Sequence, residues 1–293
     1  MNLRNMVTSP SLSRVVFNRR VGPGWYVLRL EEPQIATRAR PGQFVQIRCH
    51  DGASHDPILR RPFSVYRTDP ASGTYDIIYV TVGRGTGWMA RIPDGEARRG
   101  NDGATVDVEG PFGNTFSPPA PDDRLYLVAG GVGVAPLYFL ARELVEGDET
   151  PDITLCMGAR TREQLQGIDD FRALPIRCET ATDDGSDGFH GRVTELLAHL
   201  LEEEEEAPER ARVYGCGPQG MNESLRRLAL ERELSCEICL ESLMACGFGI
   251  CFGCVAPIRK VVGGEFYNRR ICWEGPVFDA RLLSAGIDGG GGH

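Results

Sequence analysis

The sequence predicts a multidomain protein in which an all-β unit is followed by an α/β unit and then by a small cysteine-rich unit. Short β-rich segments separated by turn residues fill residues 13–118, and strands alternate with helical patterns over residues 119–235. Six of the ten cysteines lie after residue 235. The length of 293 residues suits two or three domains.

Composition excludes several classes of protein. A net charge of −9 without any Lys/Arg-rich run argues against a nucleic-acid partner. The longest uncharged run, residues 125–141, is shorter than the roughly 20 apolar residues of a membrane span, and residues 1–20 lack the apolar core of a signal peptide. We therefore expect a cytoplasmic protein without membrane contact, whose cysteines stay reduced.

Two ends of the chain and one internal run are interpreted from their composition alone. Residues 1–12 form a leader, and residues 285–293 form a flexible glycine-rich tail. The acidic run at residues 202–206 is expected to be a solvated helix end. The cysteine-rich unit then spans residues 236–284.

The first unit is predicted to be a small antiparallel β-barrel. Its β-rich segments are punctuated by Pro41-Gly42, Asp69-Pro70 and Gly110-Pro111, and many short strands at this spacing are typical of such a barrel. The segments are residues 25–30, 44–48, 63–66, 75–82 and 105–108.

Two motifs in this unit suit a phosphate ligand. Arg61-Pro62-Phe63-Ser64 places a guanidinium, which binds phosphate bidentately, close to an aromatic ring and a hydroxyl. Residues 83–87 form a glycine-rich turn before a helix, where backbone N–H groups can hold a pyrophosphate. Taken singly, each motif is also common on ordinary strands and turns.

The second unit is predicted to be a Rossmann-like parallel sheet. Residues 125–129 read as a buried strand, residues 130–136 as a tight turn, and residues 137–146 as a helix, with further strands at 153–157, 176–180 and 212–216. A glycine-rich turn into a helix lets a pyrophosphate approach closely, although this turn lacks the Gly-x-Gly-x-x-Gly fingerprint. It is therefore compatible with a dinucleotide site or with a turn alone.

An acidic pair follows the strand at residues 176–180. A carboxylate from Asp183 or Asp184 would accept hydrogen bonds from ribose hydroxyls and repel a 2′-phosphate, which favours NAD over NADP. The alternative is that both residues only form a turn.

The third unit carries the spacing Cys246-x4-Cys251-x2-Cys254 with a distant Cys272, which is the plant-type spacing for a [2Fe–2S] cluster. Interleaved glycines allow the loop to curl around the sulfides and leave N–H groups free to point at sulfur. The rival interpretation is a zinc ribbon built from the Cys-x2-Cys pairs at 236/239 and 251/254. That interpretation leaves two cysteines unused and does not explain the glycines; we expect the remaining cysteines to pack in cores.

Together, the first two units resemble the ferredoxin–NADP reductase superfamily. The resemblance implies that Ser64 lies near flavin N5 and that Cys216 lies beside the nicotinamide, so that both align hydride transfer without any acid–base residue. It implies FAD contacts from Arg61, Pro62, Phe63, Ser64, Ile78, Tyr79, Val80, Gly85 and Thr86. It implies NAD contacts from Gly130, Gly131, Gly133, Asp183, Cys216, Gly217 and Pro218.

With the third unit included, residues 13–283 resemble the electron-transfer subunits of class B, NAD-linked dihydroorotate dehydrogenases. Residues 244–254 and 272–280 carry the most specific part of this resemblance. It implies FAD, NAD(H) and a [2Fe–2S] cluster on Cys246, Cys251, Cys254 and Cys272. It also implies a role in pyrimidine biosynthesis beside an FMN-containing catalytic subunit, two of each in the complex; the isolated chain would not oxidise dihydroorotate.

Two alternatives remain at this point. One is a related FAD/[2Fe–2S] reductase subunit, from a ferredoxin:NAD(P) oxidoreductase or a sulfide dehydrogenase. Those subunits replace the first cluster cysteine by aspartate, so Cys246 favours the dihydroorotate assignment. The other alternative is a zinc-ribbon interaction protein.

Overall fold

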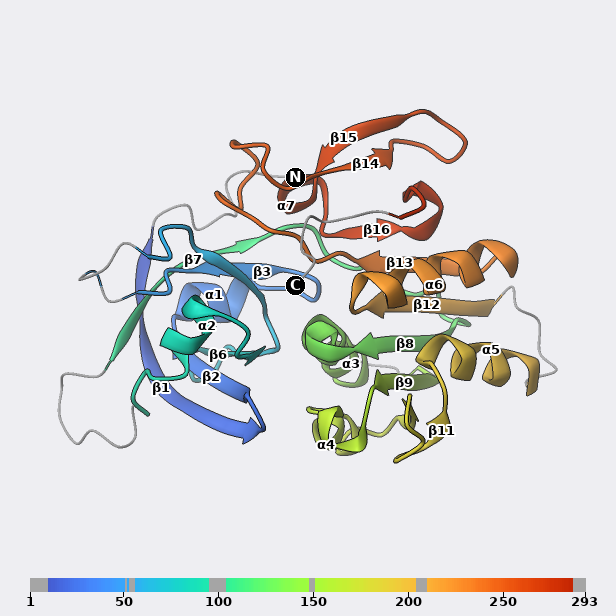
Figure 1. Ribbon diagram of the computed structural model, residues 1–293, viewed down its shortest axis with the longest axis horizontal. Coiled ribbons are helices and arrows are strands. Elements are labelled where there is room, and N and C mark those ends of the chain that lie inside the picture. Colours follow the sequence, from blue (N-terminus) through green and yellow to red (C-terminus); the bar gives the residue numbers. More distant parts are fainter. Residues whose placement is uncertain are drawn as a thin grey trace.

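The computed structural model describes residues 10–50, 52, 56–94, 104–147, 151–203 and 210–286. Three units are visible in it (Figure 1). Most of the predicted leader, the end of the acidic run and most of the glycine-rich tail lie outside the described residues.

The first unit is the predicted antiparallel barrel. Its seven strands have the order β4-β3-β7-β1-β2-β6-β5, and the sheet curls so that β4 contacts β6. Strand β1 was not predicted; it pairs with both β2 and β7. The elements are β1 (Ser11–Gly22), β2 (Trp25–Glu31), α1 (Pro33–Arg38), β3 (Phe44–Ile47), β4 (Arg61–Ser64), β5 (Arg67–Asp69), β6 (Thr74–Val80), α2 (Arg84–Met89) and β7 (Thr105–Phe112).

Alternation along β3 sends side chains to two different cores. Val45 and Ile47 pack inside the barrel. Phe44 instead packs in a core that the α/β sheet shares with the C-terminal unit and that contains Cys254 and Cys272. Because successive side chains of a strand point to opposite faces, β3 separates the barrel interior from the cysteine-rich unit.

The second unit is the predicted parallel sheet, with the strand order β11-β10-β9-β8-β12-β13-β16. Its first strand, β8, lies between β9 and β12, so the order reverses at the β8/β12 boundary. The elements are β8 (Arg124–Gly130), η3 (Gly131–Gly133), α3 (Val134–Val145), β9 (Ile153–Ala159), η4 (Arg162–Gln164), α4 (Ile168–Arg172), β10 (Arg177–Thr182), β11 (Phe189–His190), α5 (Val193–Glu203), β12 (Ala211–Cys216), α6 (Gln219–Glu231) and β13 (Ser235–Cys239).

One face of this sheet packs against the barrel. Side chains of α3 and α4 share a core with barrel residues such as Trp25 and Tyr66, whereas α5 and α6 cover the opposite face. The rings of Tyr66 and Tyr138 lie 4.6 Å apart, and the Tyr66 hydroxyl donates to Asp170. The two units therefore meet through an apolar interface that fixes their orientation.

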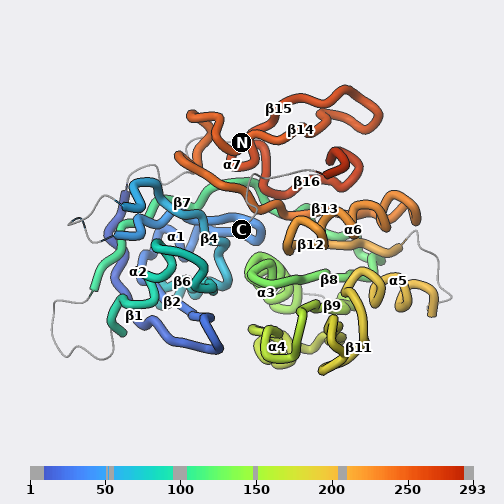
Figure 2. Tube along the Cα trace, viewed as in Figure 1, coloured from blue at the N-terminus to red at the C-terminus, as the bar shows by residue number. Residues whose placement is uncertain are grey.

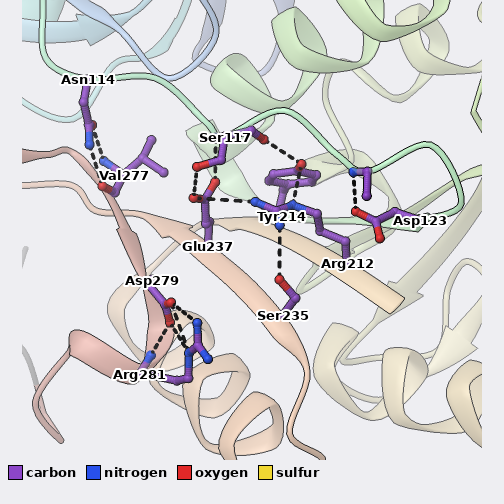
Figure 3. Close-up of polar contacts among 11 residues, drawn as sticks. Asn114, Ser117, Asp123, Arg212, Tyr214, Ser235, Glu237, Val277, Asp279 and Arg281 are labelled. Atoms are coloured by element: carbon purple, nitrogen blue, oxygen red, sulfur yellow. Dashed lines mark hydrogen bonds and ion pairs between the residues drawn. The ribbon is translucent and has the colours of Figure 1, made fainter. Parts of the chain in front are cut away.

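Residues 113–123 link the barrel to the parallel sheet, and hydrogen bonds hold this linker against the sheet (Figure 3). The Ser117 backbone N–H and hydroxyl donate to Glu237 at 2.9 and 2.6 Å. The Tyr214 hydroxyl donates to the Ser117 carbonyl at 2.8 Å and accepts from Arg212 at 2.7 Å.

The third unit, drawn in the darkest orange and red at the top of Figure 2, lies along one side of the other two units. Its elements are β14 (Val255–Arg259), β15 (Phe266–Arg270), α7 (Ile271–Glu274), β16 (Val277–Asp279) and η6 (Ala280–Leu282). Strand β16 pairs antiparallel with β13, so the sheet of the second unit continues past the boundary predicted at residue 235. Within the described ranges, no helix is long and apolar enough to cross a membrane.

Candidate functional site

The cysteine loop at residues 246–254 follows the end of β13 and curls through left-handed glycines. Gly247 and Gly249 have φ values of 80° and 87°, a region that other residues rarely adopt. A Cβ on Gly249 would lie 3.0 Å from the Trp273 side chain, next to the fourth cysteine. Glycine is thus needed for the curl, as the sequence predicted, and also for close packing against Trp273, which it did not predict.

The four predicted ligands associate as two pairs. The backbone N–H of Cys251 lies 3.5 Å from the Cys246 sulfur, and these two side chains interact. The backbone N–H of Cys272 lies 3.4 Å from the Cys254 sulfur, and these side chains interact as well. Cys246 is also close enough to Cys272 to affect its ionisation, so the pairs adjoin. Two adjoining thiol pairs fit two irons with two thiolates each.

The protein environment favours thiolates at this loop, and the thiolate is the form that binds metal. Burial opposes ionisation of Cys246, but backbone N–H groups of Cys251 and Phe248 lower its pKa to about 7. A hydrogen bond from the Cys272 thiol lowers the pKa of Cys254 to about 6. That hydrogen bond and burial raise the pKa of Cys272.

The zinc-ribbon alternative conflicts with the positions of Cys236 and Cys239. Both are buried in β13, and they belong to cores on opposite faces of the sheet. They cannot converge on one ion with the loop cysteines. In the described part of the chain, no three His, Cys, Asp or Glu side chains form a single-ion site. The expectation that these two cysteines pack in cores is confirmed.

The two predicted phosphate-binding motifs of the barrel lie side by side. A Cβ on Gly85 would be 3.6 Å from Cγ of Arg61, although 24 residues separate them in the sequence. The Thr86 hydroxyl accepts hydrogen bonds from the backbone of Val82 and Gly83 at 2.9 and 3.2 Å, which fixes the turn. The open space beside Gly83 leaves room for a ligand against this backbone.

The predicted flavin-lining strand has two different faces. Ile78 and Val80 contact the core shared with the α/β unit. The Tyr79 ring is buried inside the barrel, where it stacks on Tyr26 at 5.5 Å and meets Phe63 edge-on at 6.1 Å. Tyr79 and Phe63 thus support this wall of the barrel from within.

The predicted nucleotide turn lies at the strand-order reversal of the parallel sheet. Strands β8 and β12 are paired in register, with Cys216 opposite Ala129, so the turns after both strands meet. A Cβ on Gly133 would lie 2.0 Å from the Cys216 carbonyl oxygen, and one on Gly130 would lie 3.1 Å from Pro218. Crevices at such reversals are where open α/β sheets bind their ligands.

The turn also faces the barrel. Strand β6 contacts η3, and a Cβ on Gly167 would lie within 3.9 Å of Tyr66, Val134 and Ile78. The structure therefore brings the predicted flavin strand next to the predicted nicotinamide turn. Cys216 is buried beneath this junction, where a hydrogen bond with Cys239 and burial raise its pKa well above the ordinary value.

The two aspartates of the acidic pair, Asp183 and Asp184, have different surroundings. Asp184 accepts from the Ser186 backbone N–H and hydroxyl at 3.0 and 2.6 Å, so it forms the turn. The Asp183 carboxylate is exposed at the carboxyl end of β10. Of the two carboxylates, Asp183 is the one available for a ribose.

Two residues near these sites were not predicted. Gln46 is fully buried in β3 against the cysteine loop. Glu241 is exposed as a whole residue, but the protein around its carboxyl group raises its pKa to about 7 by desolvation. Neither residue stands in a recognisable spacing, so no sequence pattern indicated them.

Two models of known families match parts of this chain. Residues 241–284 match the iron-sulfur cluster binding domain of dihydroorotate dehydrogenase B, and residues 127–227 match the oxidoreductase NAD-binding domain. Both matches fall inside the second and third predicted units, whose exact boundaries remain predictions.

Curated relatives match nearly the whole chain. The dihydroorotate dehydrogenase B (NAD(+)) electron transfer subunit of Geobacillus kaustophilus is 36% identical, covering 91% of this chain and 95% of the relative. The same subunit from Desulforamulus reducens is 34% identical, covering 88% and 92%. The one from Enterococcus faecalis is 32% identical, covering 94% and 98%.

Solved structures agree on the fold. An NADH-dependent reduced ferredoxin-NADP oxidoreductase structure superimposes with a TM-score of 0.77 at 27% identity, covering 94% of this chain and 90% of that one. A ferredoxin NADP+ reductase from Neisseria gonorrhoeae, with bound FAD and NADP, gives a TM-score of 0.59 at 18% identity, covering 76% and 91%. The fold class predicted from the sequence is confirmed.

Proposed function

The chain belongs to the family of electron transfer subunits of NAD(+)-linked dihydroorotate dehydrogenase B, and from that membership we propose that it conducts electrons from a dihydroorotate-oxidising catalytic subunit to NAD+. Its cofactors are a [2Fe–2S] cluster, FAD and NAD(H). When bound, nicotinamide exchanges hydride, the cluster exchanges single electrons, and FAD can do both, so FAD lies between the other two.

We propose that the protein's contribution is to hold and align these groups. The paired thiolates of Cys246/Cys251 and Cys254/Cys272 hold the two irons. Arg61 and the turn at Gly85–Thr86 bind the FAD pyrophosphate, while Ser64 orients the flavin. The turn around Gly133 and the backbone after Cys216 position the nicotinamide dinucleotide; Asp183 selects its unphosphorylated ribose. Hydride transfer between stacked rings depends on alignment more than on proton transfer.

The observation that carries this proposal is the position of β3. Strand β3 pairs directly with β4, which holds the flavin motif, and its Gln46 packs against Gly247 of the cluster loop. The flavin motif therefore lies one strand away from the cluster loop, and paired strands are about 4.8 Å apart. The nicotinamide turn contacts the barrel through β6.

The test uses anaerobically purified chain. About two irons, two sulfides and one flavin per chain are expected, with absorption that bleaches on addition of NADH. The pure chain should reduce artificial dyes with NADH and should not oxidise dihydroorotate until the catalytic subunit is added. Zinc in place of iron, or dihydroorotate turnover by the chain alone, would contradict the proposal.

Matched cysteine variants locate the cluster. Cys251→Ala should lose the cluster spectrum while keeping FAD and NADH-dependent dye reduction. Cys178→Ser is the control, because Cys178 lies in β10 away from the loop. Retention of a full cluster by Cys251→Ala would remove that residue from the ligand set.

We propose a cytoplasmic complex with two copies of each subunit, since thiolate ligands need a reducing compartment. Native mass spectrometry of the co-expressed subunits tests the stoichiometry. A one-to-one complex would overturn the two-plus-two arrangement and leave the electron-transfer role intact.

A further inference from the structure

Gln46 is a buried polar residue with no internal partner. It lies in β3 with 0% of its surface exposed, and neither Nε2 nor Oε1 has a hydrogen-bond partner among the described residues. Burying an amide without hydrogen bonds is unfavourable, and such groups are rare in folded proteins. A ligand that binds next to the side chain would supply what it lacks.

The side chain is directed at the cysteine loop. A Cβ on Gly247, the residue after Cys246, would lie 2.6 Å from Cγ and 2.7 Å from Nε2 of Gln46. A side chain at residue 247 would prevent this close approach, and Gly247 also has a left-handed φ of 80°. The Gln46 amide thus adjoins the segment that holds the first cluster ligand.

The neighbouring polar groups on the barrel are already engaged. Gln46 pairs with Glu109 on one side, but that carboxylate lies 3.1 Å from Arg60. On its other side Gln46 pairs with Pro62, which has no side-chain acceptor. Neither strand neighbour therefore offers the amide a partner, whereas its Nε2 lies against Gly247 of the cysteine loop.

We propose that the Gln46 Nε2–H group donates a hydrogen bond to a sulfur of the [2Fe–2S] cluster and thereby raises the cluster's reduction potential. This inference rests on the proposed function. The reduced cluster carries one more negative charge, spread over its sulfurs, so a donor stabilises the reduced form more than the oxidised form.

The position of Gln46 gives that hydrogen bond a role in electron flow. Residues directly opposite each other on paired strands project from the same face of a sheet. Gln46 lies opposite Pro62, and Phe44 lies opposite Ser64, two residues along each strand. All four side chains therefore lie on the same face. Gln46 therefore lies between the flavin motif and the cluster loop. Its amide sets how readily the cluster accepts an electron relative to the adjacent flavin.

The test is a redox titration of the purified flavin- and cluster-loaded chain, followed by electron paramagnetic resonance. Gln46→Met and Gln46→Leu remove the donor at similar volume and should lower the potential by about 59 mV, a tenfold change in the one-electron equilibrium. The control is Gln43→Leu, because the Gln43 amide is satisfied by Gly113 and Arg40 at 2.8 and 3.0 Å. This control should leave the potential unchanged while lowering the melting temperature.

A second measurement needs no substitution. The reduced cluster of wild-type chain labelled with ¹⁵N-glutamine should show a hyperfine coupling to ¹⁵N by pulsed electron paramagnetic resonance. Absence of that coupling, or an unchanged potential in a Gln46→Met chain with an intact cluster spectrum, would overturn the inference. A wild-type chain that binds no iron or sulfide would instead refute the proposed function, so the two failures are distinguishable.

Discussion

Gly133 packs so closely against Cys216 that a Cβ at residue 133 would lie 2.0 Å from the Cys216 carbonyl oxygen and 2.8 Å from the Gly217 nitrogen. Backbone atoms cannot yield as flexible side chains do. The contact joins the turns that follow β8 and β12, at the point where the strand order reverses. Any side chain at residue 133 must therefore separate the two turns that we assign to the nicotinamide dinucleotide.

Gly133→Ala is expected to raise the KM for NADH at least tenfold, because the two turns must move apart. The rate of flavin reduction at varied NADH concentration measures the effect. Gly220→Ala is the control, since a Cβ there would meet nothing within 4 Å and α6 favours alanine over glycine by about 1 kcal/mol. Equal KM values in the two variants would contradict the assignment of the turn.

Asp183→Ala should weaken NADH binding and improve the relative use of NADPH. A lost charged hydrogen bond contributes about 1.5–3 kcal/mol, which corresponds to roughly tenfold or more in KM. The ratio of kcat/KM for NADH to that for NADPH is the readout. Asp169→Ala, at an exposed position on α4, should leave the ratio unchanged; a similar shift there would point to a general charge effect.

Asn114 fastens the barrel to the segment after Cys272 (Figure 3). Its Nδ2 donates to the Val277 carbonyl at 2.8 Å, and its Oδ1 accepts from the Val277 N–H at 2.9 Å. Asn114→Ala leaves both backbone groups unpaired and should cost about 1–3 kcal/mol of unfolding free energy.

Denaturant unfolding and iron content measure the Asn114 effect, and we expect both stability and cluster occupancy to fall. Asn268→Ala is the control, because Asn268 is exposed in β15. Unchanged stability of Asn114→Ala would show that the adjoining core alone holds the cluster unit in place.

Glu241 should make stability depend on pH. Its pKa is about 7 in the folded protein against an ordinary 4.5, raised by desolvation. Between these values the unfolded chain loses a proton that the folded chain retains, so stability falls as pH rises toward 7 and is constant above it. Because Glu241 is exposed as a whole residue, solvent screens part of this effect. The slope should therefore stay below about 1.4 kcal/mol per pH unit, the limit for one fully coupled proton.

Glu241→Gln removes this penalty. The variant and the wild type should have equal melting temperatures near pH 4.5. The difference in melting temperature should then grow in favour of the variant up to pH 7. Glu163→Gln is the opposite control, because the Thr161 hydroxyl lowers the pKa of Glu163 and the carboxylate is stabilising above that pKa. A pH-independent difference for Glu241→Gln would contradict the raised pKa.

The sequence predicted the parts of these sites that depend on local spacing. The cysteine spacing, the glycine turns and the alternation of strands with helices are encoded within short windows. The structure confirms the alternation and brings the four cysteines together as two adjoining pairs, while their role as ligands stays a prediction. Gln46 could not be predicted, because a glutamine among alternating strand residues normally indicates a solvent-facing side. It is buried only because the cysteine loop, some 200 residues later, packs on that face. The hairpin of β14 and β15 was missed as well, since β15 is short, exposed and largely polar.

That hairpin leads to a prediction about the catalytic subunit. The third unit exposes large apolar side chains at two places: Phe252 on the cluster loop is 58% exposed, and Val261 and Val262 at the tip of the hairpin are 65% and 58% exposed. Arg270 at the base of β15 lies over the Phe252 ring at 4.8 Å and donates to the Gly249 carbonyl, so the hairpin starts at the cluster loop. Electrons must enter at that loop, and exposed apolar patches mark protein interfaces. We therefore expect the catalytic subunit to cover the cluster loop and the hairpin tip.

Lys260 offers a direct measurement, because it is the only lysine in the sequence and it adjoins Val261 at the hairpin tip. Amine acylation followed by mass spectrometry should label Lys260 in the isolated chain and much less in the complex, with the N-terminal amine as internal reference. Val261→Asp should weaken the complex at least tenfold and leave NADH-dependent dye reduction intact, because a charge buried without a partner is costly. Leu12→Asp, at a 71% exposed position on β1, should bind the partner normally. Equal labelling of Lys260 in the isolated and complexed chain would place the interface away from the hairpin tip.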